Sequence, residues 1–481
     1  MTGPYGTTEF SWRLETRRLW MQALPNIGMA VTRMLMGFID FVMVSQLGTE
    51  AQAAIAPATF LVFVTMCFGM AIATTVTTFA AQAYGRGENR EASAFAWQSL
   101  YVAAFFMLFS WPLMQMVEPL FGLFGHAEAV RDLEIDYCRI AVWCIGPSIA
   151  AAGLNGFFIG VQRPSVGLLS ILAALVWTVI GNYALIFGHF GFPAMGMAGA
   201  AIATVGAWIV RAGMMMAIFL REPFRSRFHT RRTCAASGDR LRRLVAVGLP
   251  SGVQWFLDIG AWFVFLTWVI PRYGMAAMAA SNVCWQYMQL SFMPAIGIGI
   301  SLTSLVGHAI GEGRHDLAHK RVTIACVMTT AYMGSAGVLF LTARHWLVGL
   351  LSDDAAVIAA GAQMLIWVAW FQVFDGLFHV YNNALRGAGD TRWPAGAVVV
   401  TSWGMFVGGS WLAMRFVPSL GFHGPWLACT LYVIALGTAL WWRFRGGAWR
   451  RIKLFHNAPE NARIVGAGAT RVQSDSVVAA D

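Results

Sequence analysis

The sequence predicts an all-α polytopic membrane protein whose twelve transmembrane helices form two six-helix lobes related by a pseudo-twofold axis. Composition, a series of long apolar runs and an internal repeat support this prediction. Of the 481 residues, 58% are hydrophobic and 12% are charged, whereas a soluble globular chain carries about 25% charged residues. Because so few charges cannot cover the surface of a soluble protein, most of the outer surface is expected to face lipid.

The apolar runs are long enough to cross a bilayer, since a transmembrane helix needs about 20 mostly apolar residues. The first run is longer than the apolar part of a signal peptide and contains Asp40, so we interpret it as a retained span. The twelve expected spans cover residues 19–46, 53–82, 93–117, 137–160, 166–188, 198–220, 244–270, 277–305, 320–343, 357–385, 394–415 and 424–442.

Basic residues are unevenly distributed between the two sides of the expected bundle. Alternate loops on one side carry 24 Lys and Arg residues, and the other side carries only Arg131, Arg272, Arg344 and Arg415. Because basic loops remain in the cytoplasm, both termini are expected there, in a multi-pass protein of the bacterial inner membrane. This distribution also explains the net charge of +10, so we expect no nucleic-acid partner.

A basic segment, residues 221–243, divides the chain into halves and contains eight arginines. We interpret it as a cytoplasmic linker that fixes the topology, with a lipid-headgroup site as the alternative. The linker separates an N-terminal lobe, residues 1–220, from a C-terminal lobe, residues 244–445. Residues 446–481 are polar and lack periodicity, so they are expected to be a disordered cytoplasmic tail.

The two halves resemble each other in sequence. The segment Gly48–Ala54 (GTEAQAA) recurs at Gly274–Ala280 (GMAAMAA), 226 residues later. The same offset relates Thr77 to Thr303, Ala83 to Ala309, Gly85 to Gly311 and Gly87 to Gly313. Since each half has an even number of spans, the repeat is parallel and its axis runs along the membrane normal. Duplicated lobes that face each other across a cleft favour transport by alternating access.

Ionisable side chains at mid-membrane depth are costly and usually functional. Asp40 lies in the first span, which also contains Pro25 and Gly37 and is therefore expected to bend. A desolvated carboxyl that changes between neutral and charged forms suits proton or sodium coupling; a structural, hydrogen-bonded carboxylate is the alternative.

Amide and hydroxyl side chains of the fourth and fifth spans accompany Asp40. Asn155, Thr178 and Asn182 supply oxygen ligands for a hard cation such as Na⁺, which we expect at Asp40, Asn155 and Asn182. Alternatively, these side chains hold helices together.

The second half carries its own acidic pair, Asp258 and Asp375. Asp375 and His379 are four residues apart, so they share one face of a helix. A carboxylate beside an imidazole is suited to a proton relay, and a mutually satisfied pair is the alternative. Gln254 and Gln286 are expected to face a water-filled cleft between the lobes.

Arg33 is the one arginine expected far from either end of its span. It follows Pro25 by eight residues, as Asp258 follows Pro250, so the two occupy equivalent repeat positions. Because a buried charge needs a partner, we expect an Arg33–Asp258 ion pair across the cleft, with Asp40 as the alternative partner. Arg139 and Arg211 lie nearer to span ends, where their side chains are expected to reach the interface.

The sequence contains no HExxH motif, P-loop, paired CxxC or nucleophile elbow. We therefore expect no enzyme activity and no cofactor other than a coupling ion, H⁺ or Na⁺. A membrane-embedded lipid-modifying enzyme would need a catalytic cluster at the interface, and the acids here lie within the spans.

Five motifs together resemble the multidrug and toxic compound extrusion (MATE) transporters over residues 15–445. They lie at residues 37–44 (GFIDFVMV), 47–87 (LG…AYGRG), 248–258 (GLPSGVQWFLD), 371–375 (FQVFD) and 385–392 (LRGAGDTR). The resemblance implies a cleft lined by spans 1, 2, 7 and 8. It also implies a monomer in membrane lipid that exports small, cationic or amphipathic organic compounds against proton or sodium entry.

The resemblance also assigns residues to the coupling sites. Asp40 matches the family's first-span carboxylate, and Asn155 and Asn182 match polar positions around it. Asp258 and Asp375 match the acidic positions of NorM-like members.

Three residues depart from the family pattern. Thr178 replaces an Asn, and Arg33 replaces a Gln. Phe371 replaces a Tyr, so a phenol ligand is missing and protons are expected to drive transport. A lipid-linked oligosaccharide flippase of the same superfamily is the alternative function, but its cleft needs several basic residues and the sequence indicates only Arg33.

Overall fold

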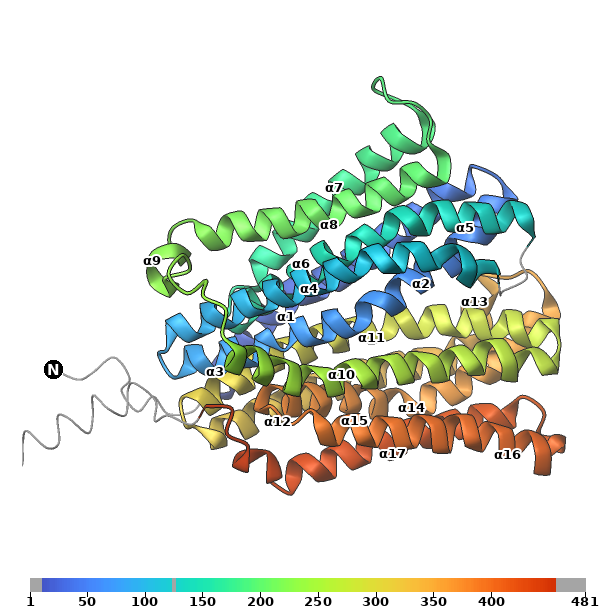
Figure 1. Ribbon diagram of the computed structural model, residues 1–481. Coiled ribbons are helices and arrows are strands. Elements are labelled where there is room, and N and C mark those ends of the chain that lie inside the picture. Colours follow the sequence, from blue (N-terminus) through green and yellow to red (C-terminus); the bar gives the residue numbers. More distant parts are fainter. Residues whose placement is uncertain (1–10, 123–126, 456–481) are drawn as a thin grey trace, which may run out of the picture.

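The computed structural model describes residues 11–122 and 127–455. All regular secondary structure in this part of the chain is helical, and twelve helices are long and apolar enough to cross a membrane. The helices run side by side along one direction (Figure 1). The predicted fold class and all twelve spans are confirmed.

Six spans build the first lobe, which is coloured blue to green in Figure 1. Two of these spans are interrupted, one at Thr75 and one by a 3₁₀ turn at Val142–Cys144. The elements are α1 (Trp12–Ser45), α2 (Thr49–Thr74), α3 (Val76–Gly85), α4 (Asn89–Gly122), α5 (Glu128–Ala141), α6 (Ile145–Gly160), α7 (Pro164–Phe187) and α8 (Gly196–Leu220).

The second lobe contains two spans with π-helical segments, Phe265–Val269 and Val400–Val407. Its spans consist of α10 (Gly238–Val264), α11 (Met275–Gly311), α12 (His315–Thr342), α14 (Ala355–Ala388), α15 (Arg392–Val399), α16 (Gly408–Phe416) and α17 (His423–Arg445). Shorter helices are α9 (Phe224–Phe228) in the linker, α13 (Arg344–Gly349) and the 3₁₀ turns Ile270–Tyr273, Pro418–Leu420 and Ala448–Arg451.

Helices begin before the apolar runs that predict them, and several, including α4, α5, α10 and α12, have polar residues in the first turn. The largest difference is at α5, which begins at Glu128, nine residues before the expected run. Similarly, α10 begins at Gly238, so the last residues of the expected 221–243 linker belong to the seventh span.

Helix packing follows the internal repeat. In the first lobe α1 packs against α7, and in the second lobe its counterpart α10 packs against α15. Between the lobes α1 packs against α11, and α10 packs against α2. Because α2 and α11 are also counterparts, these two interfaces are equivalent, as a parallel duplication predicts.

Two glycines mark the position of the repeat axis. A Cβ on Gly85 would lie 2.2 Å from the backbone oxygen of His308, and a Cβ on Gly311 would lie 2.2 Å from that of Gln82. Gln82 and His308 are themselves 226 residues apart, as are the two glycines. The contact is therefore reciprocal, and the axis passes between α3 and α11 at this point.

Each lobe has its own hydrophobic core, and a few residues cross between them. Leu19 and Ala23 of α1 belong to the core of the second lobe, and Leu244 of α10 belongs to that of the first. Large apolar side chains also cover the outer surface, as Leu108 and Trp442 do. These outward residues are suited to contact with lipid.

The linker lies along α4 of the first lobe. Ser93 donates to the carbonyl of Phe228 at 2.7 Å, and Trp97 donates to that of Thr230 at 2.7 Å. We call the end of the bundle that carries this linker and α9 the linker end; α5, α13 and α16 lie at the opposite end (Figure 1).

Phe455, from the segment after the twelfth span, packs on the first lobe at the linker end. Its ring lies 6.2 Å from that of Phe79 and 6.0 Å from that of Phe95, which stack on each other at 4.3 Å. The guanidinium of Arg86 lies 5.1 Å from the centre of the Phe455 ring. Phe455 therefore completes an aromatic cluster that belongs to the other lobe.

Candidate functional site

Asp40 and Asn182 meet inside the first lobe because α1 packs against α7. The Asn182 amide donates a 2.6 Å hydrogen bond to Oδ1 of Asp40. Asn182 is buried, so this bond lies within the lobe interior. The structure thus brings together two of the residues that the sequence predicts for the coupling site.

Two further oxygens near Asp40 have no hydrogen-bond partner. Thr178 is one turn before Asn182 on α7, and its hydroxyl and Oδ1 of Asn182 are buried without a partner among the described residues. Unpaired buried oxygens are costly, and oxygen atoms are the ligands that hard cations prefer. The oxygen atoms of Asp40, Thr178 and Asn182 therefore form a group of ligands that suits a small cation or a proton.

Asn155 does not belong to this set, contrary to the expected ligand group. Its Oδ1 packs against Gly167, beside Met29. Met29 precedes Asp40 by eleven residues of α1, which is a rise of about 16 Å. The prediction failed because Asn155 lies near the linker end of α6, at a different depth from Asp40.

A cavity of about 510 Å³ adjoins Asp40 between α1, α2, α7 and α8. We call it the first-lobe cavity; its wall includes Arg33, Gly37, Asp40, Phe60, Phe63, Thr178, Thr204, Trp208 and Arg211. Gly37 is one turn before Asp40, and a Cβ there would meet no atom within 4 Å. The cavity is therefore open in front of the carboxylate.

Arg211 lines the first-lobe cavity and does not reach the membrane interface as expected. Its residue surface is 4% exposed, and its Nε has no hydrogen-bond partner among the described residues. Its guanidinium lies 5.5 Å from the centre of the Trp208 ring. Arg139, for which the same expectation was made, forms a 2.5 Å ion pair with Glu118.

The acidic pair of the second lobe has a partner that the sequence analysis missed. Tyr432 of α17 donates a 2.7 Å hydrogen bond to Oδ1 of Asp258 on α10. The sequence feature that could have identified Tyr432 is its position, since it places a polar phenol in the middle of the last span.

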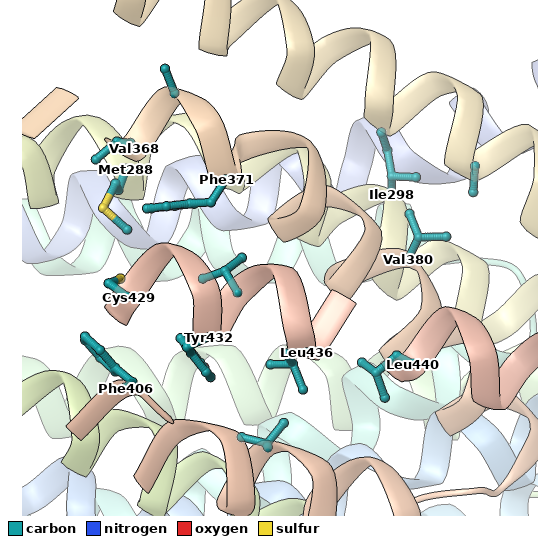
Figure 2. Packing of buried hydrophobic residues seen from close by; sticks show 14 of the residues in the cluster. Met288, Ile298, Val368, Phe371, Val380, Phe406, Cys429, Tyr432, Leu436 and Leu440 are labelled. Atoms are coloured by element: carbon teal, nitrogen blue, oxygen red, sulfur yellow. The ribbon is translucent and has the colours of Figure 1, made fainter. Parts of the chain in front are cut away.

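Phe371 is buried in the core of the second lobe, together with Phe406, which stacks on Tyr432 at 5.3 Å (Figure 2). The phenol that Phe371 lacks is thus supplied by a different helix.

The structure places Asp375 and His379 on one face of α14, as their spacing predicts. Nε2 of His379 lies 3.8 Å from Oδ2 of Asp375, which is an ion-pair distance rather than a hydrogen bond. Gln254 of α10 is buried, and Gln286 of α11 is exposed. No hydrogen bond joins either glutamine to this pair within the described residues.

The comparisons with known proteins agree with this architecture. A family model described as MatE matches residues 25–184 and 259–409. The chain belongs to the MatE family. The "Probable multidrug resistance protein NorM" of Rhizobium meliloti (strain 1021) is 31% identical over 447 residues, which cover 90% of this chain and 94% of that protein.

Two further proteins illustrate the range of similarity. The "Multidrug resistance protein MdtK" of Edwardsiella ictaluri (strain 93-146) is 25% identical over 435 residues, covering 89% of this chain and 94% of that protein. A mutant of VcmN, a MATE transporter from Vibrio cholerae, superposes with a TM-score of 0.81 at 16% identity, covering 92% of this chain and 99% of that one.

The expected ion pair between Arg33 and Asp258 is absent from this MatE protein in the conformation described. Over residues 11–122 and 127–455, no ion pair joins Arg33 to Asp258 or to Asp40. Arg33 lines the first-lobe cavity, whereas Asp258 is bonded to Tyr432 within the second lobe. Equivalent repeat positions meet only where they lie close to the axis, and these two residues do not.

The lobes of this MatE protein are joined at the linker end. Ion-pair and hydrogen-bond partners across the interface include Glu15–Arg321 at 2.8 Å and Asn26–Ser301 at 2.7 Å. Gln82 also donates to the carbonyl of Gly387 at 3.0 Å. In the described part of the chain, side-chain hydrogen bonds between the lobes are confined to this half of the bundle. The conformation is therefore closed at the linker end.

Proposed function

We propose that this MatE protein is a secondary active antiporter that exports small amphipathic organic molecules by alternating access, driven by cation entry. The observation that carries the proposal is the position of Asp40. Its carboxylate is bonded to Asn182 and also lines the first-lobe cavity. A coupling ion at Asp40 and a molecule in the cavity would therefore influence each other directly.

The interface at the linker end supports the proposal of alternating access, because it can exist in a formed and a broken state. In the described conformation, the hydrogen bonds and glycine contacts of this interface are formed. They would break in a state that is open at the linker end. A ligand changes such an equilibrium only through different affinities for the two states. We propose that binding at Asp40 supplies this difference by changing the charge of the cavity wall.

We propose that protons are the coupling ions. In the second lobe the phenol of Tyr432 donates to Asp258, and the neighbour of Asp375 is the imidazole of His379. These neighbours exchange or donate protons rather than offering a shell of carbonyl and carboxylate oxygens for Na⁺. Reconstituted vesicles that export only with a sodium gradient, and ignore a pH gradient, would contradict this assignment.

The topology belongs to the same proposal. The twelve spans and the bacterial relatives place the protein in the inner membrane as a multi-pass protein. We propose that the linker end, where most basic loops lie, is cytoplasmic and that the protein acts as a monomer. Residues 1–220 and 244–445 would then be the two moving lobes, joined by the 221–243 linker; the expected tail beyond residue 455 lies outside the described residues.

Names of relatives favour efflux over the alternative of lipid-linked oligosaccharide flipping. The curated relatives are named as multidrug resistance proteins, and such proteins are transporters rather than enzymes. We propose the same class of small organic cargo for this chain.

An accumulation assay in efflux-deficient bacteria tests the proposal. Cells that express the protein should accumulate less of an amphipathic dye, and collapse of the pH gradient should remove the difference. Asp40→Asn should abolish it while expression is unchanged. Asp136→Asn, the same chemical change at an exposed position of α5, serves as the control. An Asp40→Asn protein that exports at the wild-type rate would refute the role of Asp40.

A further inference from the structure

We propose that the first-lobe cavity binds the anionic group of an amphipathic organic molecule between Arg33 and Arg211. The proposed function is needed only to call this molecule the transported cargo; the binding site itself follows from the charges of the cavity wall. The inference replaces the expectation of a cationic cargo, which came from the resemblance to the family.

Two arginines from different helices face the same cavity. Arg33 comes from α1 and Arg211 from α8, and both line the cavity. Two positive charges on the wall of one cavity repel each other. An arginine cannot lose its proton in a protein. Both groups therefore stay charged, and an anion bound between them would offset their repulsion.

Neither arginine has a carboxylate partner within residues 11–122 and 127–455. Arg33 is exposed, whereas Arg211 is 4% exposed. Two arginines elsewhere in the bundle do pair with carboxylates: Arg321 lies 2.8 Å from Glu15, and Arg443 lies 2.9 Å from Asp390. By contrast, Nε of Arg211 is buried and has no hydrogen-bond partner in the part of the chain that the structure describes. An unpaired charge in such an environment is costly, which indicates that a partner is bound during the working cycle.

Asp40 does not neutralise the pair. Among the described residues it is the only acid in the wall of the first-lobe cavity, and its bonded partner is the amide of Asn182. With Asp40 charged the wall has a net charge of one positive unit, and with Asp40 neutral it has two. A cationic molecule would be repelled in both cases, whereas a carboxylate, sulfonate or phosphate would be attracted.

The other walls indicate what the anion carries. Phe60, Phe63 and Trp208 line the cavity, and Arg211 is held over the ring of Trp208 at 5.5 Å. Aromatic walls beside a fixed guanidinium suit a flat ring bearing an acidic group. The volume of about 510 Å³ lies within the usual range of roughly 300–1,000 Å³ for small-molecule sites.

The same chemistry occurs in two sources, a soluble aromatic acid and the phosphate of an anionic lipid. We assign the site to the soluble acid because the aromatic walls match a ring rather than an acyl chain. The assignment also predicts the effect of Asp40. Removing its negative charge should strengthen the binding of an anion, whereas the binding of a cation would weaken.

Binding of 2-naphthalenesulfonate to the purified protein in phosphatidylcholine nanodiscs tests the proposal. We expect Arg33→Gln and Arg211→Gln each to raise the Kd at least tenfold, and Asp40→Asn to lower it. Arg272→Gln is the matched control, since Arg272 lies in the second lobe beside Trp268 and does not line the cavity; its Kd should be unchanged. A 2-naphthylmethylammonium probe should bind the wild type more weakly than the sulfonate does, and neither arginine substitution should weaken its binding.

Three results would overturn the proposal. The first is equal sulfonate binding by the wild type and by folded Arg33 and Arg211 variants. The second is tighter binding of the ammonium probe that is lost in Asp40→Asn. The third is displacement of the sulfonate by phosphatidylglycerol nanodiscs in an Arg211-dependent manner, which would assign the site to lipid.

Further variants and outcomes distinguish a folding defect from a binding defect, and this inference from the proposed function. If Arg211→Gln does not fold, Arg211→Lys keeps the charge but loses the planar fork, and a several-fold weaker binding is expected from it. Efflux that depends on Asp40 without sulfonate binding would refute this inference alone. Arginine-dependent sulfonate binding with efflux that ignores Asp40 would refute the proposed function alone.

Discussion

Tyr432 donates a 2.7 Å hydrogen bond to Oδ1 of Asp258, which joins the last transmembrane helix to the seventh. The ring of Tyr432 is itself fixed by stacking on Phe406 in the π-helical segment of the eleventh span. A second contact from that segment reaches the same place, because Trp403 donates to the carbonyl of Leu257 at 3.0 Å. The Asp258 site is therefore held by three spans of one lobe.

Removal of this phenol should impair transport more than stability. Tyr432→Phe leaves Asp258 without its donor, and a hydrogen bond to a charged group contributes about 1.5–3 kcal/mol, which corresponds to roughly a ten- to hundredfold effect on the equilibrium at this site. We expect proton-driven efflux from vesicles to fall by about tenfold or more. Tyr287→Phe, which loses a 2.5 Å bond to the carbonyl of Leu347, should keep its efflux rate.

Thr178 should be required for coupling, although its hydroxyl makes no hydrogen bond to any described residue. Thr178→Val preserves the shape and removes one unpartnered oxygen beside Asp40. We expect weaker ion dependence of efflux and unchanged or slightly higher thermal stability, because an unsatisfied buried group is lost. Thr230→Val removes a similar unpartnered hydroxyl from the linker and should leave the ion dependence intact.

Alanine at either axial glycine should open the linker end. Gly85→Ala and Gly311→Ala each place a methyl group against the backbone of the opposite lobe, and such overpacking costs about 1–3 kcal/mol. Spin labels at Arg90 and Asp316, both exposed, with the exposed Cys234 replaced by Ser, should report longer distances. Gly396→Ala, which meets no atom within 4 Å, should give the wild-type distribution, and an equal distribution in all variants would contradict the prediction.

The ion pair between Glu15 and Arg321 should contribute strongly to stability. Its side chains are 8% and 4% exposed, and breaking a buried pair costs about 3–5 kcal/mol because one charge is left alone. We expect Glu15→Gln to lower the melting temperature by several degrees. Glu91→Gln breaks a pair with Arg240 whose side chains are about a third exposed, so its effect should be below about 1 kcal/mol.

The sequence was sufficient for the fold because hydrophobic run length and the 226-residue repeat determine the spans and their pairing. It also located Asp40 and Asn182, whose types are unusual within a span. It misjudged Arg211, because the distance from a helix end is compatible with both an interfacial and an inward-facing side chain, and only the packing of α8 selects the face.

Repeat equivalence likewise does not imply contact. Gly85 and Gly311 lie next to the repeat axis, and each contacts the helix that carries the other. Arg33 and Asp258 lie away from this axis. Tyr432 was missed because its partner is 174 residues distant along the chain, and spacing within one helix cannot reveal such a pair.

Phe455 has a consequence for biosynthesis. The stacked rings of Phe79 and Phe95 leave the ribosome early, whereas the residue that covers them is made only after the entire second lobe. Leu19 and Ala23 of α1 likewise belong to the hydrophobic core of the second lobe, which is synthesised later. The packing of this aromatic cluster can therefore be completed only after the second lobe and Phe455 have been synthesised.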